Sequence, residues 1–195
     1  MYRINKVCIY FLLLLIFSAG SMSAQEVTTP NGYPVIDLSA LNPLGAVLSS
    51  ADAASRRTTM NQQTPSNIAY LAVGKPVSGF NGIWDAKMSI KYQVMQADLG
   101  SITDWASAWN QCKSYSGEGG DAGTWRLPTH RELQMICILH PLLIGKGNFT
   151  AFKANNYWDA SEDTETYACL VRFTDGNVGS NIKTILYYVR CVRDL

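Results

Sequence analysis

TWRLPTHREL, residues 124–133, is the stretch that decides the fold of this 195-residue chain. Thr129 and Glu132 have the spacing of a capping box, in which both side chains accept hydrogen bonds from backbone N–H groups at a helix start. A helix is therefore predicted from this point, and Pro141 is predicted to end it because proline lacks a backbone donor. The predicted inward face of this helix consists of Leu133, Ile136, Cys137 and His140.

A second helix is predicted on the N-terminal side of this stretch. The residues that recur with the spacing of one helix face are Trp105, Ala108, Trp109 and Cys112. Ser101 or Thr103 can cap its start, and Asp104 suits the positive end of its dipole. A glycine-rich loop over residues 117–123 then leads back to the capping box.

The remaining periodic segments around these helices predict strands. Apolar and polar residues alternate over residues 88–94, which is strand periodicity. Three more strands are predicted, over residues 157–160, 167–173 and 185–192. Asp175-Gly176 predicts a turn at the start of the connection between the last two.

Residues 25–79 differ in composition from the segment that follows them. They hold five of the seven prolines and no Trp, Phe or Cys. Because aromatic side chains dominate the energetics of a core, the core is predicted to lie after residue 79. Residues 25–79 are therefore predicted to be an extended Pro/Ser/Thr-rich arm with short strands over 35–38 and 68–73.

The first 24 residues have the layout of a secretory signal peptide. Arg3 and Lys6 precede an apolar run over residues 9–17, which is followed by small residues. A membrane anchor is the alternative, but the run is shorter than the roughly 20 residues that a spanning helix needs. The cut is predicted after Ala24, with Ser21 and Ser23 as alternatives. The mature chain is then exported to the periplasm, the cell surface or the medium, with no transmembrane segment.

The charge of the chain argues against binding to nucleic acid. The formal net charge is +1, and removing residues 1–24 leaves 14 basic against 15 acidic residues. Proteins that bind a phosphate backbone usually carry a basic patch or stripe. The aromatic content of 11% also argues against a disordered chain.

The four cysteines of the mature chain predict two disulfide bonds, because an even number in an exported protein favours bridges. The close-spaced pairs typical of zinc and dithiol sites are missing from the sequence. Four cysteines allow three pairings. Cys112 on the first helix is predicted to pair with Cys191 on the last strand, and Cys137 with Cys169. A bond between Cys112 and Cys137 would overturn this pairing.

The motifs, taken in order, resemble a known family. Trp125-Arg126-Leu127-Pro128-Thr129, Tyr157-Trp158 and Tyr188-Val189-Arg190-Cys191-Val192-Arg193 are similar to motifs of the Lcl C-terminal domain family. These are bacterial exported domains, related to the major paralogous domain of fibre-degrading bacteria. The resemblance covers about residues 80–195. One departure is Trp158-Asp159-Ala160-Ser161, where family members commonly have Trp-Ser-Ser-Thr.

The resemblance implies a fold and a setting. The fold class is α+β: a C-type-lectin-like domain over 80–195, with two helices, small antiparallel sheets and adjacent chain ends, preceded by the N-terminal arm. The setting is adhesion, with a glycan or an extracellular-matrix protein as ligand. A shared fold does not by itself carry a binding site with it.

The loop after the second helix supplies the candidate ligand-binding residues. It contains aromatic residues that can stack on sugars, among them Phe149 and Phe152, next to amide and carboxylate groups. The candidate ligand-binding residues are Asn155, Asn156, Tyr157, Trp158 and Asp159. A place in the core is the alternative for Trp158.

Calcium is the only cofactor that the sequence suggests. Calcium-dependent lectins use Glu-Pro-Asn or Gln-Pro-Asp triplets, which this chain lacks. Its dense acidic cluster could supply oxygen ligands to Ca²⁺, or form a solvated loop, and consists of Asp159, Glu162, Asp163 and Glu165.

The arginines of the motifs have structural interpretations. Arg126 is predicted to pair with a carboxylate or with backbone carbonyls. Arg190 and Arg193 are predicted to stack on nearby rings, namely Tyr187, Tyr188 or Trp158.

Three functions are compatible with these features, and adhesion or recognition without catalysis is the one predicted. A fimbrial subunit or tip component is the alternative, with residues 35–38 of the arm adding a strand to a partner subunit. An enzyme related to the formylglycine-generating enzymes is a third possibility, since those share the lectin-like fold. It would need a cysteine pair, and the predicted disulfides use all four mature cysteines. Neither His130 nor His140 has an obvious Ser or Cys companion in the sequence.

Overall fold

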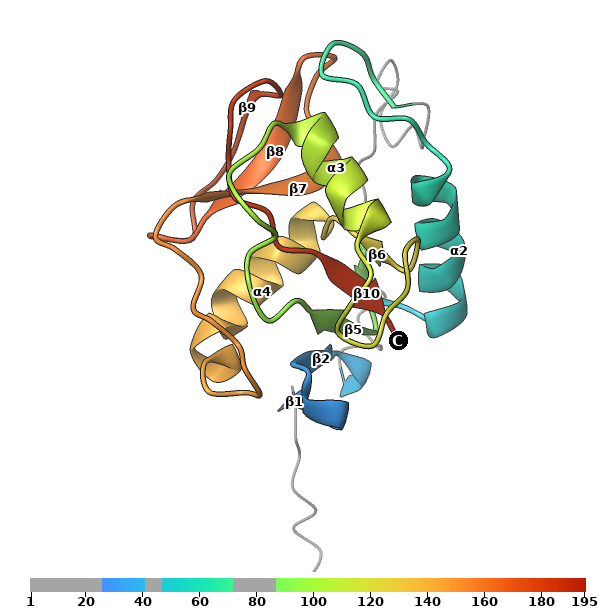
Figure 1. Cartoon of the computed structure of the whole chain (residues 1–195), viewed down its shortest axis with the longest axis vertical. Helices are drawn as coiled ribbons and strands as arrows, with labels where there is room; N and C mark the ends of the chain where they lie inside the picture. Colours follow the sequence, from blue (N-terminus) through green and yellow to red (C-terminus); the bar gives the residue numbers. More distant parts are fainter. Residues whose placement is uncertain (1–25, 41–46, 72–86) are drawn as a thin grey trace, which may run out of the picture.

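The computed structural model describes residues 26–40, 47–71 and 87–195, and these form a mixed α+β structure (Figure 1). Its helices are α2 (Ser50–Asn61), α3 (Trp105–Ser114) and α4 (His130–Leu143). Its first strands are β1 (Glu26–Thr28), β2 (Val35–Asp37), β3 (Val47–Leu48), β4 (Met88–Ser89), β5 (Lys91–Val94) and β6 (Trp125–Arg126). The later strands are β7 (Asn156–Glu162), β8 (Tyr167–Arg172), β9 (Val178–Ile182) and β10 (Val192–Asp194).

The largest sheet of the described residues is antiparallel, with strand order β1-β2-β5-β10-β6. Val94 of β5 lies opposite Val192 of β10, so the beginning of the second half of the chain is hydrogen-bonded to its end. Two smaller sheets are the parallel pair β3-β4 and the antiparallel sheet β7-β8-β9.

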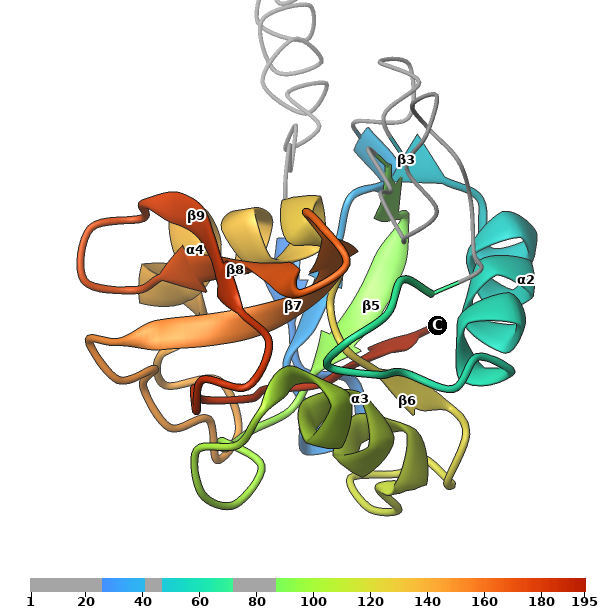
Figure 2. The same ribbon diagram turned by 90° about the horizontal axis from the view of Figure 1, so that it is seen from above.

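β7 is buried on both faces, because it passes between α3 and α4 (Figure 2). Successive side chains of a strand point to opposite faces. Tyr157 therefore joins the apolar cluster that contains the α4 residue Leu133, whereas Trp158 joins the cluster that contains the α3 residue Trp109. The two clusters make the sheet β7-β8-β9 the middle layer of this part of the molecule.

The N-terminal segment contradicts the prediction of an extended arm. β2 confirms the strand expected over residues 35–38, but it is paired on both sides, with β1 and with β5. α2 was not predicted, because only Ala53 and Met60 of this polar helix are buried. It packs against β6 and β10 (Figure 1). Residues 68–71 form no strand, and residues 72–73 lie outside the described residues.

Both predicted helices are confirmed, with changes at their ends. α3 is capped by Asp104, whose carboxylate accepts a hydrogen bond from the backbone N–H of Ser107 at 3.0 Å. Ser101 and Thr103 are therefore not its caps. α4 starts at the predicted capping box but continues past Pro141 to Leu143. Leu143 is fully buried, and its burial favours a last turn that Pro141 weakens by one hydrogen bond.

The predicted strands near residues 90, 158 and 170 are confirmed as β4–β5, β7 and β8. The strand over residues 185–192 is wrong for most of its length, because only β10 at its end is regular. Tyr187 and Tyr188 instead form isolated bridges with Thr103 and Tyr157. β9 was missed because its five residues, from Val178 to Ile182, lie at the surface and carry no apolar alternation.

The predicted signal peptide over residues 1–24 lies outside the described residues. Within the described ranges, no helix has the length and apolar character that crossing a membrane requires.

Candidate functional site

A buried ion network holds the TWRLPTHREL stretch in place. Arg126 donates to both carboxylate oxygens of Glu132, at 2.6 and 2.9 Å, and to Asp194 Oδ1 at 2.6 Å. The Oγ of Ser89 and the carbonyl of Leu127 accept further hydrogen bonds from the same guanidinium. The structure therefore confirms the prediction that Arg126 pairs with carboxylates and carbonyls. The network joins β4, β6, α4 and β10.

The Glu132 carboxylate is the centre of this network. Burial raises its pKa, but the nearby Arg126 and Arg56 guanidinium groups outweigh burial and hold the pKa well below the ordinary 4.5. Its carboxylate also accepts hydrogen bonds from the backbone N–H groups of Ser89 and Thr129, at 2.9 and 2.8 Å.

We expect the free energy of unfolding to fall as the pH drops below about 4.5. A carboxyl whose pKa is lower in the folded state stabilises the fold above the pKa of the unfolded chain, and this stabilisation is lost as pH falls towards the folded pKa. Urea unfolding at a series of pH values between 7 and 3 measures this dependence. Glu132→Gln should be less stable at pH 7 and show a shallower dependence. An equally steep dependence in both proteins would contradict the assignment to Glu132.

Two other motif arginines stack on rings, but not on the predicted ones. Arg190 lies over the ring of Phe152, with 4.0 Å from guanidinium carbon to ring centroid, and donates to Asp98. Arg193 lies 5.6 Å from the ring centroid of Trp125. The predicted rings Tyr187, Tyr188 and Trp158 are not these partners.

The structure contradicts most of the predicted ligand-binding set. Tyr157, Trp158 and Asp159 are fully buried, because β7 is covered on both faces. Of the five, Asn155 is exposed and Asn156 half-buried. The indole Nε1 of Trp158 donates to the carbonyl of Thr103 at 3.0 Å, which confirms the alternative of a core role. Phe149 and Phe152 are also buried.

The predicted calcium ligands do not converge on one point. Asp159 faces His130, and Glu162 is buried in an ion pair with Lys183. Asp163 and Glu165 are exposed. The carboxylate of Asp163 accepts a hydrogen bond from the Oγ of Ser180 at 2.6 Å. Asp159, Glu162 and Asp163 each have a separate partner, and the four carboxylates form no common metal-binding group among the described residues, which contradicts a calcium site built from this set.

One of the two predicted disulfides is present. Cys112 and Cys191 are bonded, with 5.6 Å between their Cα atoms. Cys137 and Cys169 are both free, so the second predicted bond is wrong. Cys169 lies beside His130 in the first turn of α4. Cys137 comes seven residues later, about 10 Å further along the helix axis, where it faces Gly176.

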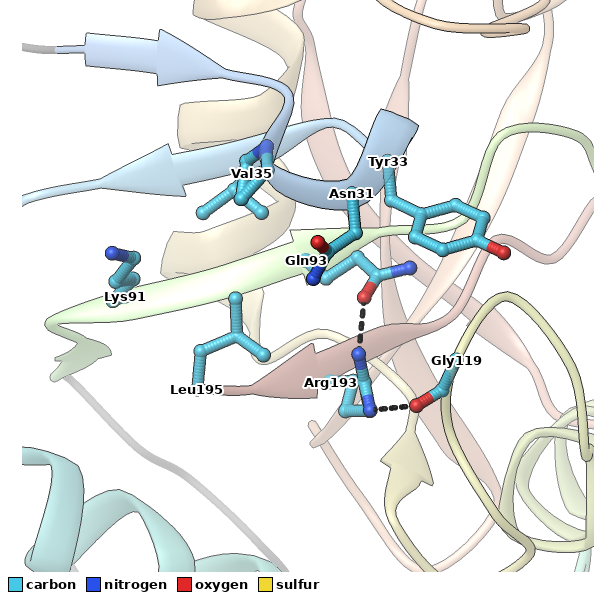
Figure 3. A pocket seen from close by; sticks show the side chains of 9 residues that line it. Asn31, Tyr33, Val35, Lys91, Gln93, Gly119, Arg193 and Leu195 are labelled. Atoms are coloured by element: carbon cyan, nitrogen blue, oxygen red, sulfur yellow. Dashed lines mark hydrogen bonds between the residues drawn. The ribbon is translucent and has the colours of Figure 1, made fainter.

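A pocket lies between the turn that follows β1 and strands β5 and β10 of the main sheet (Figure 3). Its cavity of about 330 Å³ is open to one side between the 30–35 segment and strands β5 and β10. The segment contributes Pro30, Asn31, Tyr33 and Val35. The strands contribute Lys91, Gln93 and Arg193, the glycine-rich loop contributes Gly119, and Leu195 follows the end of β10.

The polar wall of the pocket is held by its own hydrogen bonds (Figure 3). Arg193 donates through Nη2 to Gln93 Oε1 at 2.6 Å and through Nη1 to the carbonyl of Gly119 at 2.5 Å. Gln93 donates in turn to the carbonyl of Glu118 at 2.9 Å. These side chains are therefore oriented before any ligand arrives.

The opposite wall depends on a tight turn. Asn31 and Gly32 have φ angles of 57° and 83°, and Tyr33, which follows them, lines the end of the pocket near Gly119 (Figure 3). Gln96 donates to the carbonyl oxygen of Gly32 at 3.0 Å. A Cβ atom at Gly147 would overlap the same oxygen, so the adjacent loop packs closely against this turn.

Lys91 lies at the far end of the pocket, with its Nζ atom 3.6 Å from Asp37 Oδ2. Burial raises the pKa of Asp37, but hydrogen bonds from Ser39 and the charge of Lys91 outweigh burial and lower it. This pocket was not predicted from the sequence, because its residues are scattered along the chain. The turn residues Asn31-Gly32-Tyr33-Pro34 were the single local signal.

These features define an α+β domain that a disulfide closes and that carries a polar pocket. Residues 80–193 match the model of the Lcl C-terminal domain family, and the chain belongs to that family. The match confirms the resemblance inferred from the motifs. A comparison with curated proteins found no significant match. Four residues of the pocket, from Pro30 to Val35, precede the part of the chain that the family model covers.

Proposed function

We propose that this protein is an extracytoplasmic recognition module with a C-type-lectin-like fold, which binds a glycan in the Tyr33–Gln93–Arg193 pocket and catalyses no reaction. Membership of the Lcl C-terminal domain family supports the recognition role. The disulfide between Cys112 and Cys191 supports a location outside the cytoplasm, where such bonds persist.

The observation that carries the glycan assignment is the composition of the pocket walls. A saccharide presents apolar C–H faces and a rim of hydroxyl groups. The ring of Tyr33 offers a surface for the former, and the amides of Asn31 and Gln93 offer donors and acceptors for the latter. Gln93 and Arg193 are already hydrogen-bonded to each other. Less side-chain entropy is therefore lost when a saccharide binds.

The charge of the pocket favours an acidic saccharide over a neutral one. Lys91 and Arg193 both line it, whereas none of its lining side chains is acidic. Guanidinium and ammonium groups bind carboxylate and sulfate groups well. The carboxylate of Asp37 lies 3.6 Å from the Lys91 Nζ atom and offsets part of this charge.

A recognition module is favoured over a fimbrial subunit for one structural reason. The strand that would have joined a partner subunit is β2, and it is already paired on both edges within this chain. Strand addition needs an edge with unpaired backbone groups.

Replacing Tyr33 with alanine is expected to weaken saccharide binding roughly 2- to 10-fold, the range that the loss of one aromatic contact of about 0.5–1.5 kcal/mol implies. The probe is an array of uncharged, carboxylated and sulfated oligosaccharides, followed by titration calorimetry with the saccharide that is retained best. Tyr167→Ala is the matched control, because Tyr167 is a surface tyrosine on β8. Lys91→Ala should weaken only the charged saccharides.

Three outcomes would contradict the proposal. Folded wild-type protein could bind no saccharide on the array. Tyr33→Ala could bind as tightly as wild type, or Tyr167→Ala could lose as much affinity as Tyr33→Ala.

A further inference from the structure

A second cluster of chemically active side chains lies away from the pocket. It joins three elements: His130 opens α4, Asp159 lies in the middle of β7, and Cys169 lies on β8. Each residue offers one atom that could bind a metal ion: a ring nitrogen of His130, a carboxylate oxygen of Asp159 and the sulfur of Cys169. These three atoms lie within 4.8 Å of one another. Among the described residues this is the one group of three such side chains that converges on a point.

Hydrogen bonds orient the side chains of this cluster. His130 Nδ1 lies 2.6 Å from Asp159 Oδ2. The other carboxylate oxygen of Asp159 accepts a hydrogen bond from the backbone N–H of Ser161 at 2.7 Å, and its carbonyl accepts one from Trp105 Nε1 at 2.8 Å. The hydrogen bonds that Ser161 and Trp105 donate to Asp159 come from outside the cluster, and such outer-shell bonds hold metal ligands in place and tune metal affinity.

The cluster is enclosed, but one side reaches the surface. Asp159 is fully buried and Cys169 is 5% exposed. The side chain of His130 is 12% exposed, so a small ion can enter beside its ring.

We propose that His130, Asp159 and Cys169 form a Zn²⁺ site that ties the start of α4 to the sheet β7-β8-β9. Imidazole, carboxylate and thiolate are the three ligand types that zinc takes in proteins, and zinc accepts all three in one tetrahedral site. A water molecule completes the fourth position. The ion displaces the proton of the Cys169 thiol and the proton shared by His130 Nδ1 and Asp159, both of which leave to solvent, and the imidazole binds through an unprotonated nitrogen.

Charge balance and donor softness support zinc over calcium. One carboxylate and one thiolate neutralise the two positive charges of the ion, so the buried site carries no net charge. Calcium would need six to eight oxygen ligands, and this cluster offers one carboxylate beside a nitrogen and a sulfur. The site shares no residue with the saccharide pocket, so either assignment can fail without the other.

The test is equilibrium dialysis of the folded, disulfide-intact mature chain against Zn²⁺, followed by metal analysis. We expect one zinc per chain, and Cys169→Ser should weaken binding by at least about tenfold, since even the loss of an outer-shell partner costs that much. Cys137→Ser is the matched control, because Cys137 is the other free cysteine and lies further along α4. It should bind zinc as wild type does. With Co²⁺ in place of zinc, thiolate-to-cobalt charge-transfer absorption should appear in wild type and Cys137→Ser and vanish in Cys169→Ser.

A second measurement uses wild-type protein alone, so its result holds even if a variant fails to fold. Zinc should slow alkylation of the Cys169 thiol and leave the rate at Cys137 unchanged, as peptide mapping of the labelled protein can show. The proposal is overturned if wild type retains no zinc, if Cys169→Ser retains as much as wild type, or if zinc protects both cysteines equally or neither. In that case the His130–Asp159 contact is a structural pair alone.

Discussion

Replacing Arg126 with alanine is expected to lower the free energy of unfolding by about 3–5 kcal/mol, the cost of removing one partner of a buried ion pair. Arg126 is 1% exposed, and the two carboxylates that it contacts are also buried. The substitution leaves Glu132 and Asp194 charged, desolvated and without their shared partner. Urea unfolding at pH 7, followed by tryptophan fluorescence, measures the loss.

The pH dependence distinguishes this cause from lost packing. If the uncompensated carboxylates destabilise the variant, its deficit relative to wild type should narrow as acid protonates them. Arg172→Ala is the matched control, because Arg172 forms its ion pair with Asp175 at the surface, where such pairs contribute little. A deficit that stays constant with pH, or an equal loss in Arg172→Ala, would contradict the assignment.

Removing the disulfide is expected to have the second large effect. Cys112 and Cys191 are 79 residues apart, and in the chain-entropy model the closure of such a loop stabilises the fold by about 4.5 kcal/mol. Replacing both with alanine should therefore lower the unfolding free energy by about 2–5 kcal/mol, the range found for native bonds. Thermal unfolding of wild type and the double variant, without reductant, measures the difference.

The free cysteines supply the control for this prediction. Cys137→Ser should change stability far less, since Cys137 is half-buried and unbonded. Thiol titration of the denatured, unreduced chain from residue 25 onward should find two free thiols. A count of zero would restore the pairing of Cys137 with Cys169 and contradict the structure.

Local signals were sufficient for the two central helices. One signal is the capping box formed by Thr129 and Glu132, and the other is the apolar spacing from Trp105 to Cys112. Each involves residues that are close together in the sequence, and both helices form where they were predicted. α2 and β9 were missed because their sequences are polar. Both elements are stabilised by contacts with residues that are distant in the sequence, and a local pattern does not show such contacts.

The ligand-binding prediction failed for a reason that also lies in tertiary packing. Aromatic residues in an apparent loop look accessible in a sequence, yet β7 is covered by α3 on one side and α4 on the other. The disulfide prediction was half right for a related reason. Cys137 on α4 and Cys169 on β8 belong to elements that do pack together, but Cys169 lies beside His130 in the first turn of α4, seven residues before Cys137.

The sequence by itself determined the family, the α+β class, the two central helices and the pairing of Arg126 with a carboxylate, because each rests on side chains that interact at short separation or form a recognisable motif. Only the tertiary structure decided the two candidate sites. The pocket needs Tyr33 beside Gln93 and Arg193, and the proposed zinc site needs His130 beside Asp159 and Cys169. These residues are far apart in the chain, and they meet because strand pairing and helix packing bring their elements to one place.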